Sequence, residues 1–599
     1  MARSSVAKVE IPGGDKPVEG PIGRIWEGDF VSAFSDVFPW KEQNPIDAEK
    51  TAALIDEIRT ELLPIVNTTS IEEEREVPIA VLEKMSDLGL FALKVPEERF
   101  GKGLSQWSYN DVLGFLGSVS SALAAYASAH NSLGALYPIL YYGTEEQRQK
   151  FLLAVMRWPT GFCFTEQMVG SDPASMQTYA TRVRNEDKNL IGYRLNGEKW
   201  YTTNALRAKY LAVVANTIDW KHQLLPGFGK CFSLFLVRTD SPGVIIGPPN
   251  KFAGMHGIDN ANPQFRDVFV LLDHRIGPEG KGFNIALEAL NTGRIAVAAI
   301  ASAAVKQALS ISREWANKRD QRGLIGKYEL IQEKLFRMAV ELYAMETLVQ
   351  CAASRSDRHL DASVEAAAAK IFATEVGWQC VDDMLQIRGG RGYEASESLR
   401  RREEWAPPVE RIWRDLRVAR VFEGTSEILT LWDVARGLYP YLGLAARAVS
   451  GGVTTKAKVG LTLLLWHEKL RFSKRHNWKD VPPELRNHLD FAERASRQFA
   501  RQIIGSCLKY QKKLQHKQLL IERMFWISAR ILTIALVVAR ASASGRKEEV
   551  ALADAYARHA AGEIKRLFFE WGNNEDGLVR PSAEKILGGE FSFLERGII

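Results

Sequence analysis

Apolar and polar positions in the first part of the chain follow the period of a helix. Leu54, Ile58 and Leu62 recur at i, i+4 and i+8, and an alanine-rich stretch, SALAAYASAH, follows them. Such spacing places apolar side chains on one face of a helix. It predicts an N-terminal helical domain over residues 47–158, preceded by an N-terminal extension over residues 1–46.

The period of the apolar residues changes to two near residue 160. Segments such as YLAVVANT, CFSLFLVRTD and FRDVFVLL are typical of strands. We interpret YRLNGEKWY as a hairpin that turns at Asn196 and Gly197, because Asn-Gly favours a two-residue turn. The pattern predicts a middle β domain over residues 159–276.

Helical periodicity returns after the β segment and continues to the end of the chain. The small residues of ALEALNTGRIAVAAIASAAVKQALSISREWANKR permit close packing of helices. We expect one helical domain over residues 277–437 and a C-terminal helical domain over residues 438–599. The predicted fold class is mainly α with an inserted β domain: a helical bundle, a β barrel or sandwich, a second helical bundle and a helical tail.

Composition and charge narrow the class of protein. The 599 residues are 46% hydrophobic and 25% charged, which is the balance of a globular protein. The net charge of +6 arises from 78 basic and 72 acidic residues, so the excess is too small to indicate a nucleic-acid partner. The five cysteines form no CxxC pair, so we expect no metal site and no disulfide framework.

Targeting signals are weak in this sequence. The first twenty residues lack an apolar signal region, which predicts a cytoplasmic location, or a mitochondrial one if the chain is a processed form. The apolar run ILTIALVVA is shorter than the about 20 residues of a membrane-spanning helix, so none is expected. Residues 456–479 carry seven Lys or Arg against one Glu, and Val459, Leu463, Trp466 and Leu470 share one helical face. This pattern is typical either of a helix that contacts a membrane surface or of a core-facing helix with a solvated basic face.

Two motifs of the β domain combine hydroxyls with glycine or aromatic residues. In FCFTEQMVGSD, Thr165 could donate a hydrogen bond to a ring and Gly170 could let backbone approach a ligand; a simple turn capped by Asp172 is the alternative. In KWYTTN, Tyr201 and Thr203 are expected on one strand face, where they suit either a flat ring or packing within the sheet.

Three further motifs lie in the second helical domain. QIRGGRGY places glycines at the end of a helix, which fits either a ligand loop or a helix cap. Arg319 follows a helix and could hold a phosphate in its guanidinium fork or simply be solvated. RVFEGTSEI sets Glu423 between apolar residues and Gly424. An apolar setting raises the pKa of a carboxyl group toward the pH at which a general base is effective.

Taken in this order, the motifs resemble the acyl-CoA dehydrogenase family, most closely its very-long-chain branch. The resemblance covers about residues 50 to 437 and is densest in LNTGRIAVAA, ELIQEKL, QIRGGRGY and RDLRVARVFEGTSEIL. The helical tail after residue 437 is also carried by that branch. The resemblance implies FAD as cofactor, a long-chain fatty acyl-CoA as substrate, an electron-transfer flavoprotein as acceptor and a trans-2-enoyl-CoA as product.

The resemblance also implies a role for each motif. Glu423 would remove the α-proton while the β-hydrogen leaves as hydride to flavin N5, and Gly424 would leave room for the thioester. Some relatives take the base from the position that is Gly293 here, so that base is absent. The residues expected to bind acyl-CoA are Ser171, Asn291, Thr292, Gly293, Arg294 and Gly424.

The residues expected to bind FAD form two groups. Those around the isoalloxazine would be Phe162, Phe164, Thr165, Gly170, Ser171, Tyr201, Thr202 and Thr203. Those at the adenine and pyrophosphate would be Arg319, Gln386, Gly389, Gly390, Thr425 and Glu427, some of them reaching across a subunit interface. A homodimer or larger assembly is therefore expected.

Several alternatives remain open at this point. An acyl-CoA oxidase would use the same proton abstraction but pass electrons to oxygen, and a non-catalytic relative could serve in assembly or bind nucleic acid. Ser128, Ser132 and Ala135 could leave a slot for a long acyl tail or simply allow close packing. The charged insertion at residues 396–410 is expected to be a surface excursion of unknown function.

Overall fold

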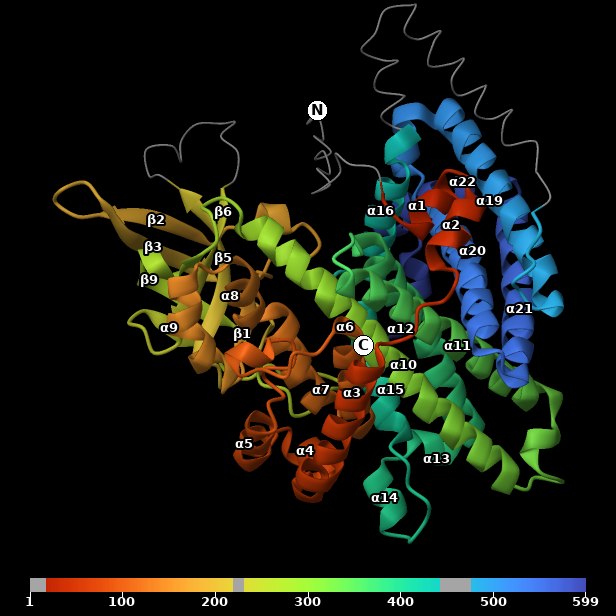
Figure 1. Cartoon of the computed structure of the whole chain (residues 1–599), viewed down its shortest axis with the longest axis horizontal. Coiled ribbons are helices and arrows are strands. Elements are labelled where there is room, and N and C mark those ends of the chain that lie inside the picture. The colour runs from red at the N-terminus through yellow and green to blue at the C-terminus, as the bar shows by residue number, and fades with distance from the viewer. Residues whose placement is uncertain (1–17, 219–230, 442–475, 599) are drawn as a thin grey trace, which may run out of the picture. The chain divides into compact units, whose positions relative to one another are not determined.

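The computed structural model describes residues 18–218, 231–441 and 476–598. The chain divides into two compact units, which we describe separately. The core unit is Lys41–Leu429, and the terminal unit combines Met1–Trp40 with Thr430–Ile599. The predicted fold class, mainly α with an inserted β domain and a C-terminal helical domain, is confirmed (Figure 1). The ranges of the predicted domains stay predictions.

The core unit begins with a group of short helices. The predicted apolar face is confirmed, because Leu54, Ile58 and Leu62 are all buried in one hydrophobic cluster. The helices are α3 (Pro45–Glu57), α4 (Thr68–Glu74), α5 (Ile79–Asp87), α6 (Gln106–Val119), α7 (Ser121–Ser128), α8 (Leu136–Tyr142) and α9 (Glu145–Met156).

A twisted sheet follows these helices. Its strands run in the order β10-β6-β5-β2-β3-β9-β7, with β1 paired to β5, while β4 and β8 form a separate pair. The strands are β1 (Gly161–Cys163), β2 (Tyr179–Arg184), β3 (Leu190–Glu198), β4 (Thr202–Thr203), β5 (Tyr210–Ile218), β6 (Phe232–Arg238), β7 (Val244–Ile246), β8 (Asn260–Ala261), β9 (Pro263–Leu271) and β10 (Arg275–Ile276).

The predicted hairpin at Asn196 and Gly197 is wrong. Strand β3 runs straight through both residues, and its register with β9 shifts between Leu195 and Gly197, which marks a β-bulge. Gly197 has φ 138°, and a Cβ there would lie 2.6 Å from the Thr178 hydroxyl. The glycine therefore serves a bulge and a close approach rather than a turn.

Long helices complete the core unit. Helix α10 packs against α6, α11 and α12, and its many buried alanines allow this close approach (Figure 1). The helices are α10 (Gly282–Lys318), α11 (Glu329–Asp357), α12 (Ser363–Arg388), α13 (Gly390–Tyr393), α14 (Ser396–Arg400), α15 (Val409–Arg417) and α16 (Ser426–Gly437), the last of which crosses the boundary to the terminal unit.

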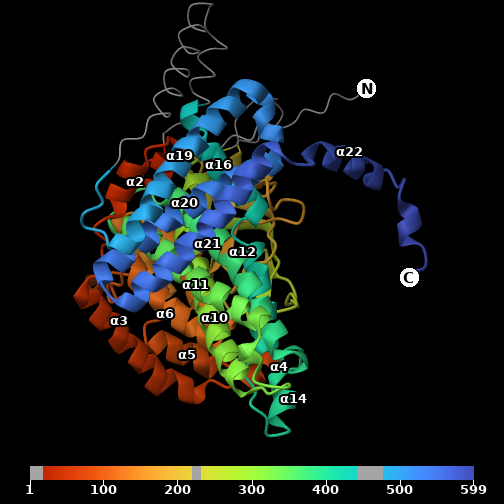
Figure 2. The ribbon, with the colours of Figure 1, turned by 90° about the vertical axis from the view of Figure 1, so that its right-hand side faces the viewer.

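Segments from both ends of the sequence build the terminal unit. Its helices are α1 (Pro21–Trp26), α2 (Phe30–Val37), α19 (Pro483–Tyr510), α20 (Gln518–Ser544), α21 (Lys547–Gly572) and α22 (Asp576–Leu587). Helices α19, α20 and α21 run side by side, and α22 extends away from them (Figure 2). Trp26 is buried against Phe499, with ring centroids 4.9 Å apart. The expected N-terminal extension thus contains two helices that pack on the C-terminal segment.

Within the residues that the structure describes, two helices are long and apolar enough to cross a membrane. They are α10 and α20, and 61% and 89% of their most apolar windows are buried inside the protein. Core helices meet the same test, so this is weak evidence for a span. Of the proposed basic membrane segment, residues 456–475 lie outside the described residues.

Candidate functional site

Glu423 lies on a tight turn between two helical segments. It has φ 54°, Gly424 follows with φ 95°, and α16 begins two residues later. The Thr425 hydroxyl accepts a hydrogen bond from the Ile428 amide at 3.3 Å, which caps α16. A left-handed conformation is uncommon for a residue with a side chain, and such residues are concentrated at functional sites.

Gly293 on α10 makes room for the Glu423 carboxylate. A Cβ at position 293 would lie 2.7 Å from Glu423 Oε2 and 3.0 Å from Oε1. This position, which carries the base in some relatives, therefore has a different role here. Only glycine leaves space at position 293 for the carboxylate of Glu423, which belongs to another segment.

Burial controls the charge of Glu423. It raises the pKa of the carboxyl group to about 7, against the opposing effect of Arg294 and Lys370. Oε2 is enclosed and has no hydrogen-bond partner among the described residues. A carboxylate with an unpaired oxygen and a pKa near neutrality suits a general base.

Two cations hold the backbone on either side of this carboxylate. Arg294 Nε donates to the Glu423 carbonyl at 3.4 Å, and its Nη1 donates to Asn291 Oδ1 at 2.9 Å. Lys370 is fully buried and donates from Nζ to the Gly424 carbonyl at 2.8 Å. Burial lowers the pKa of Arg294 to about 10 and that of Lys370 to about 8.

Lys370 was missed by sequence reasoning. The available signal was a single lysine inside the apolar run EAAAAKIFA, since lysine is almost never fully buried without a partner. The structure brings it together with Asn291, Gly293, Arg294 and Gly424, which were predicted to line the substrate site. Thr292, from the same predicted group, is buried on α10.

The structure gives a further explanation for glycine at position 424, in addition to the clearance for a thioester that the sequence predicts. Its φ is positive, and a Cβ there would lie 2.9 Å from Leu429 Cδ2. The residue is therefore required by backbone conformation and by packing, and clearance for a thioester stays a prediction.

Tyr109 on α6 packs against the proposed small-residue slot. Its hydroxyl lies 2.7 Å from Ser132 Oγ and 3.5 Å from the Ser128 carbonyl, all of them buried. The Glu423 charge contributes to the raised pKa of Tyr109. The Tyr109 hydroxyl therefore packs on the face that carries Ser128 and Ser132, and a slot for a long acyl tail stays a prediction.

The predicted isoalloxazine residues come from β1 with the loop after it and from the segment around β4, and these two segments contact each other. Thr165, Gly170, Ser171 and Thr203 are partly or fully exposed, and Tyr201 is 55% exposed. Tyr201 was expected to share a strand face with Thr203, which is wrong. It has φ 57° and precedes the two-residue strand β4, and its amide donates to Asn262 Oδ1 at 3.0 Å.

The remaining predicted residues of this group are less accessible. The Phe162 and Phe164 rings stack 5.5 Å apart and pack against a hydrophobic cluster, so their backbone is better placed than their rings for contact with a ligand. Thr202 is buried, with Oγ1 3.5 Å from Cys163 Sγ.

A buried ion pair, also missed by sequence reasoning, fixes the loop that carries Thr165. Lys199 Nζ donates to Glu166 Oε1 at 2.9 Å and to the Phe164 carbonyl at 3.1 Å. The Trp200 amide donates to the Thr165 carbonyl at 2.9 Å. The end of β1 is therefore tied to the end of β3.

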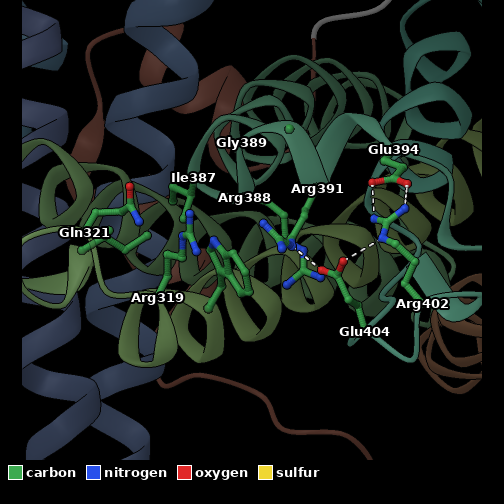
Figure 3. A pocket seen from close by; sticks show the side chains of 12 residues that line it. Arg319, Gln321, Ile387, Arg388, Gly389, Arg391, Glu394, Arg402 and Glu404 are labelled. Carbon is green, nitrogen blue, oxygen red and sulfur yellow. Dashed lines mark hydrogen bonds and ion pairs between the residues drawn. The ribbon is translucent and has the colours of Figure 1, made fainter. Parts of the chain in front are cut away.

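A cavity of about 570 Å³ lies at the C-terminal ends of α10 and α12 (Figure 3). Arg319, Gly389 and Gly390, all predicted to hold a pyrophosphate, line this cavity. Gln386 is exposed and does not line it. The structure therefore assembles half of the six residues predicted for the adenine and pyrophosphate.

Thr425 and Glu427, from the same predicted group, lie beside Glu423 instead. The length of helix α12 gives the distance between the Glu423 turn and the cavity. Lys370 contacts Gly424, and Arg388, which lines the cavity, lies 18 residues farther along the same helix. At 1.5 Å per residue this distance is roughly 27 Å. Within a single chain, the six residues predicted for the adenine and pyrophosphate therefore cannot all contact one small chemical group.

Comparison with known proteins shows which family this chain belongs to. Acyl-CoA dehydrogenase N-terminal, middle and C-terminal domain families match residues 51–158, 161–268 and 280–439. Probable acyl-CoA dehydrogenase FadE10 of Mycobacterium tuberculosis is 34% identical over 619 residues, which cover 100% of this chain and 93% of the relative. Human mitochondrial very long-chain specific acyl-CoA dehydrogenase is 30% identical over 502 residues, covering 80% and 73%.

A solved structure extends the likeness to most of the fold. The FAD complex of an acyl-CoA dehydrogenase from Bacillus anthracis superposes with a TM-score of 0.73 at 26% identity, covering 90% of this chain and 91% of that one. The chain therefore belongs to the acyl-CoA dehydrogenase family, and its cofactor is FAD.

Proposed function

We propose that this protein catalyses the α,β-dehydrogenation of a long-chain fatty acyl-CoA to the trans-2-enoyl-CoA, with Glu423 as the base. The observation that carries the proposal is the Glu423 carboxylate, which lies in a space left by Gly293 and has an unpartnered Oε2. A carboxyl group with a pKa of about 7 is partly ionised near neutral pH and can accept an α-proton. General-base catalysis of this kind contributes about 10² to 10⁴ in rate.

The neighbours of Glu423 keep this base in position. Lys370 and Arg294 bind the carbonyls of Gly424 and Glu423, so the carboxylate is presented from a fixed backbone. Their positive charges also stabilise the ionised form, which burial alone would suppress. Enclosure keeps water away from Oε2, so solvent does not compete for the proton acceptor.

The residues present fit the FAD cofactor. FAD, when bound, accepts the hydride that leaves the β-carbon. Thr165, Gly170, Ser171, Tyr201 and Thr203 offer hydroxyls, backbone and an aromatic ring on two accessible segments of the β domain that contact each other. The arginines of the distant cavity, including Arg388 with its unpartnered guanidinium nitrogens, provide the positive charge that a diphosphate requires.

Substrate length and partners belong to the same proposal. A long acyl chain is supported by the likeness to the very long-chain human enzyme over 80% of this chain. An electron-transfer flavoprotein as acceptor, a homodimer or larger assembly, a cytoplasmic location and a peripheral membrane contact through residues 456–479 are proposed on the family resemblance and on the sequence.

The test is anaerobic reduction of the bound flavin by saturated acyl-CoA esters of increasing chain length. The parent protein should bleach its flavin with long esters, whereas Glu423→Gln, which keeps the shape but cannot accept a proton, should bleach about 10² to 10⁴ times more slowly. Glu584→Gln is the control, because Glu584 lies on α22, forms a surface ion pair with Arg580 and should react like the parent.

The results separate the alternatives. Bleaching restricted to short or branched esters would remove the long-chain assignment. Fast re-oxidation by oxygen with peroxide release would indicate an acyl-CoA oxidase, and absence of bleaching with every ester would indicate a non-catalytic relative. Equal rates for the parent and Glu423→Gln would contradict the role of Glu423.

A further inference from the structure

Arg388 occupies an unusual position in the cavity of about 570 Å³. Its guanidinium is stacked between two indole rings, 4.2 Å from the Trp315 centroid and 4.3 Å from the Trp405 centroid. Nη2 donates to the Trp405 carbonyl, and the residue is only 3% exposed. Arg388 Nε and Nη1 have no hydrogen-bond partner in the described residues.

The charges that line the cavity are unequal. Four arginines (Arg319, Arg388, Arg391 and Arg402) and two glutamates (Glu394 and Glu404) line it, which leaves two positive charges in excess. Both glutamates are already engaged (Figure 3), because Arg402 binds Glu394 through two bonds of 2.6 and 2.8 Å and Glu404 through one of 2.9 Å. Glu404 also binds Arg391.

The excess charge is therefore located on Arg319 and Arg388. Neither side chain has a carboxylate partner among the described residues, and the nearby Glu314 is paired with Lys318 at 2.6 Å. Helix C-termini attract arginine, and both residues lie at such ends. That attraction does not explain a buried guanidinium with two unused nitrogens, because an unsatisfied buried donor is costly.

The insertion at residues 396–410 builds one side of this cavity. It contributes Arg402 and Glu404 to the lining and Trp405 to the stack around Arg388. The segment expected to be a surface excursion thus places charged and aromatic side chains against the glycine motif.

We infer that the insertion closes a diphosphate-binding site in which Arg388, held between Trp315 and Trp405, binds the phosphates together with Arg319. A diphosphate bridge carries one negative charge on each phosphate, which matches the excess of two. The bidentate guanidinium fork suits phosphate oxygens, and the two indoles hold it in one orientation before the ligand arrives. Arg319 was already expected to hold the FAD pyrophosphate; Arg388, Trp405 and the insertion are assigned here.

Two ligands of this protein class contain such a diphosphate next to adenosine, namely FAD and coenzyme A. The site lies roughly 27 Å along α12 from the residue that holds Gly424. The five-carbon ribityl chain that joins the flavin ring to the diphosphate is too short to span this distance. If the ligand is FAD, its reactive ring lies in a second copy of the chain.

The test uses the purified full-length holoprotein and measures the rate of flavin release by fluorescence. Arg388→Ala should release flavin about tenfold to a hundredfold faster, since a hydrogen bond to a charged group is lost. Arg388→Lys, which keeps the charge but not the planar fork, should fall between, and Trp405→Ala should change release in the same direction. Arg401→Ala is the control, because Arg401 belongs to the insertion but is 76% exposed and does not line the cavity.

Further measurements distinguish a binding role from a structural one. Glu404→Gln removes a negative charge from the lining while keeping a hydrogen-bond acceptor, so it should hold flavin at least as tightly as the parent. A purely structural insertion would predict the opposite. The difference between the parent and Arg388→Ala, which removes the positive charge, should shrink in about 1 M salt, where charge interactions are screened.

The source of the diphosphate follows from the KM for acyl-CoA. Faster flavin release with an unchanged KM identifies FAD, and a raised KM with unchanged flavin release identifies coenzyme A. If Arg388→Lys and Trp405→Ala change neither quantity, the inference is overturned. Flavin release is measured without substrate, so this result is independent of whether the proposed dehydrogenation is correct.

Discussion

Gly293 determines, at the scale of single residues, where the Glu423 carboxylate can lie. Replacing Gly293 with alanine would place a methyl group 2.7 Å from Oε2 and force the carboxylate to move. Displacement of a reacting group by about 1 Å can cost roughly 10² in rate. We expect Gly293→Ala to reduce the rate of flavin bleaching by about that factor, as measured by anaerobic stopped-flow.

Stability should change little in this variant, because alanine is favoured over glycine inside a helix. Gly114→Ala is a matched control, since its added methyl would make an ordinary 3.6 Å contact with Ala303. A Gly293→Ala protein that bleaches as fast as Gly114→Ala would show that the carboxylate does not depend on this space.

The Glu423 side chain should also make stability depend on pH. Its pKa is raised from 4.5 to about 7, so the folded state binds the proton more tightly than the unfolded state. Below about pH 4.5 the carboxyl group therefore does not lower the free energy of unfolding. As the pH rises toward 7 it lowers this free energy progressively, and above pH 7 the reduction is constant at roughly 3 kcal/mol or less.

Glu423→Gln removes this reduction. It should be more stable than the parent at pH 8 by up to roughly 3 kcal/mol, and equally stable at pH 4.5, in denaturant unfolding. Glu584→Gln, a substitution in the surface ion pair with Arg580, is measured in the same way as a control. A constant difference between Glu423→Gln and the parent across this range would contradict the raised pKa.

Helix α12 connects two features at the scale of elements. Its first half carries Lys370 to the Gly424 carbonyl, and its last residue, Arg388, lies in the distant cavity. A single helix thus sets the distance between the proposed base and the proposed diphosphate site.

Lys370 acts through the turn it holds, as a positioning residue. Its positive charge lowers the pKa of Glu423, so Lys370→Met should move the pH midpoint of flavin bleaching to a higher value. Lys306→Met is the control, because Lys306 is 61% exposed and pairs with Glu346. A lower rate with an unchanged midpoint would leave Lys370 with a structural role only.

The terminal unit shows, at the scale of the whole molecule, how two ends of the sequence form one core. Trp26 is buried, its carbonyl accepts from the Tyr441 hydroxyl at 2.5 Å, and a Cβ at Gly437 would lie 2.4 Å from its indole. The Ser496 hydroxyl donates to the neighbouring Ile25 carbonyl at 3.1 Å. The first helix is therefore an integral part of this unit.

Replacing Trp26 with alanine should leave a cavity and destabilise the terminal unit by about 3 to 5 kcal/mol. We expect an earlier unfolding transition by calorimetry or denaturant. Phe593→Ala removes an aromatic ring that is 54% exposed and should leave the transition unchanged. Similar transitions for Trp26→Ala and the parent would mean that the N-terminal helices contribute little to this unit.

Sequence patterns were reliable where the cause of a structure is local. The i, i+4, i+8 spacing of Leu54, Ile58 and Leu62 predicted a buried helical face, and the change of period predicted the β domain. The hairpin prediction at Asn196-Gly197 was wrong because a glycine with a positive φ fits both a hairpin turn and a β-bulge. The pairing with the neighbouring strands decides between the two.

The sequence by itself determined the fold class and the family, and it predicted the base, because periodicity and motif order follow from the order of residues along the chain. Only the tertiary structure decided that Gly293 houses the Glu423 carboxylate, that Lys370 holds its turn and that the 396–410 insertion faces Arg388. These pairs are separated by 17 to 130 positions, from Arg388 and Trp405 to Gly293 and Glu423, and their chemistry depends on distance, enclosure and charge, which exist only once the segments have packed.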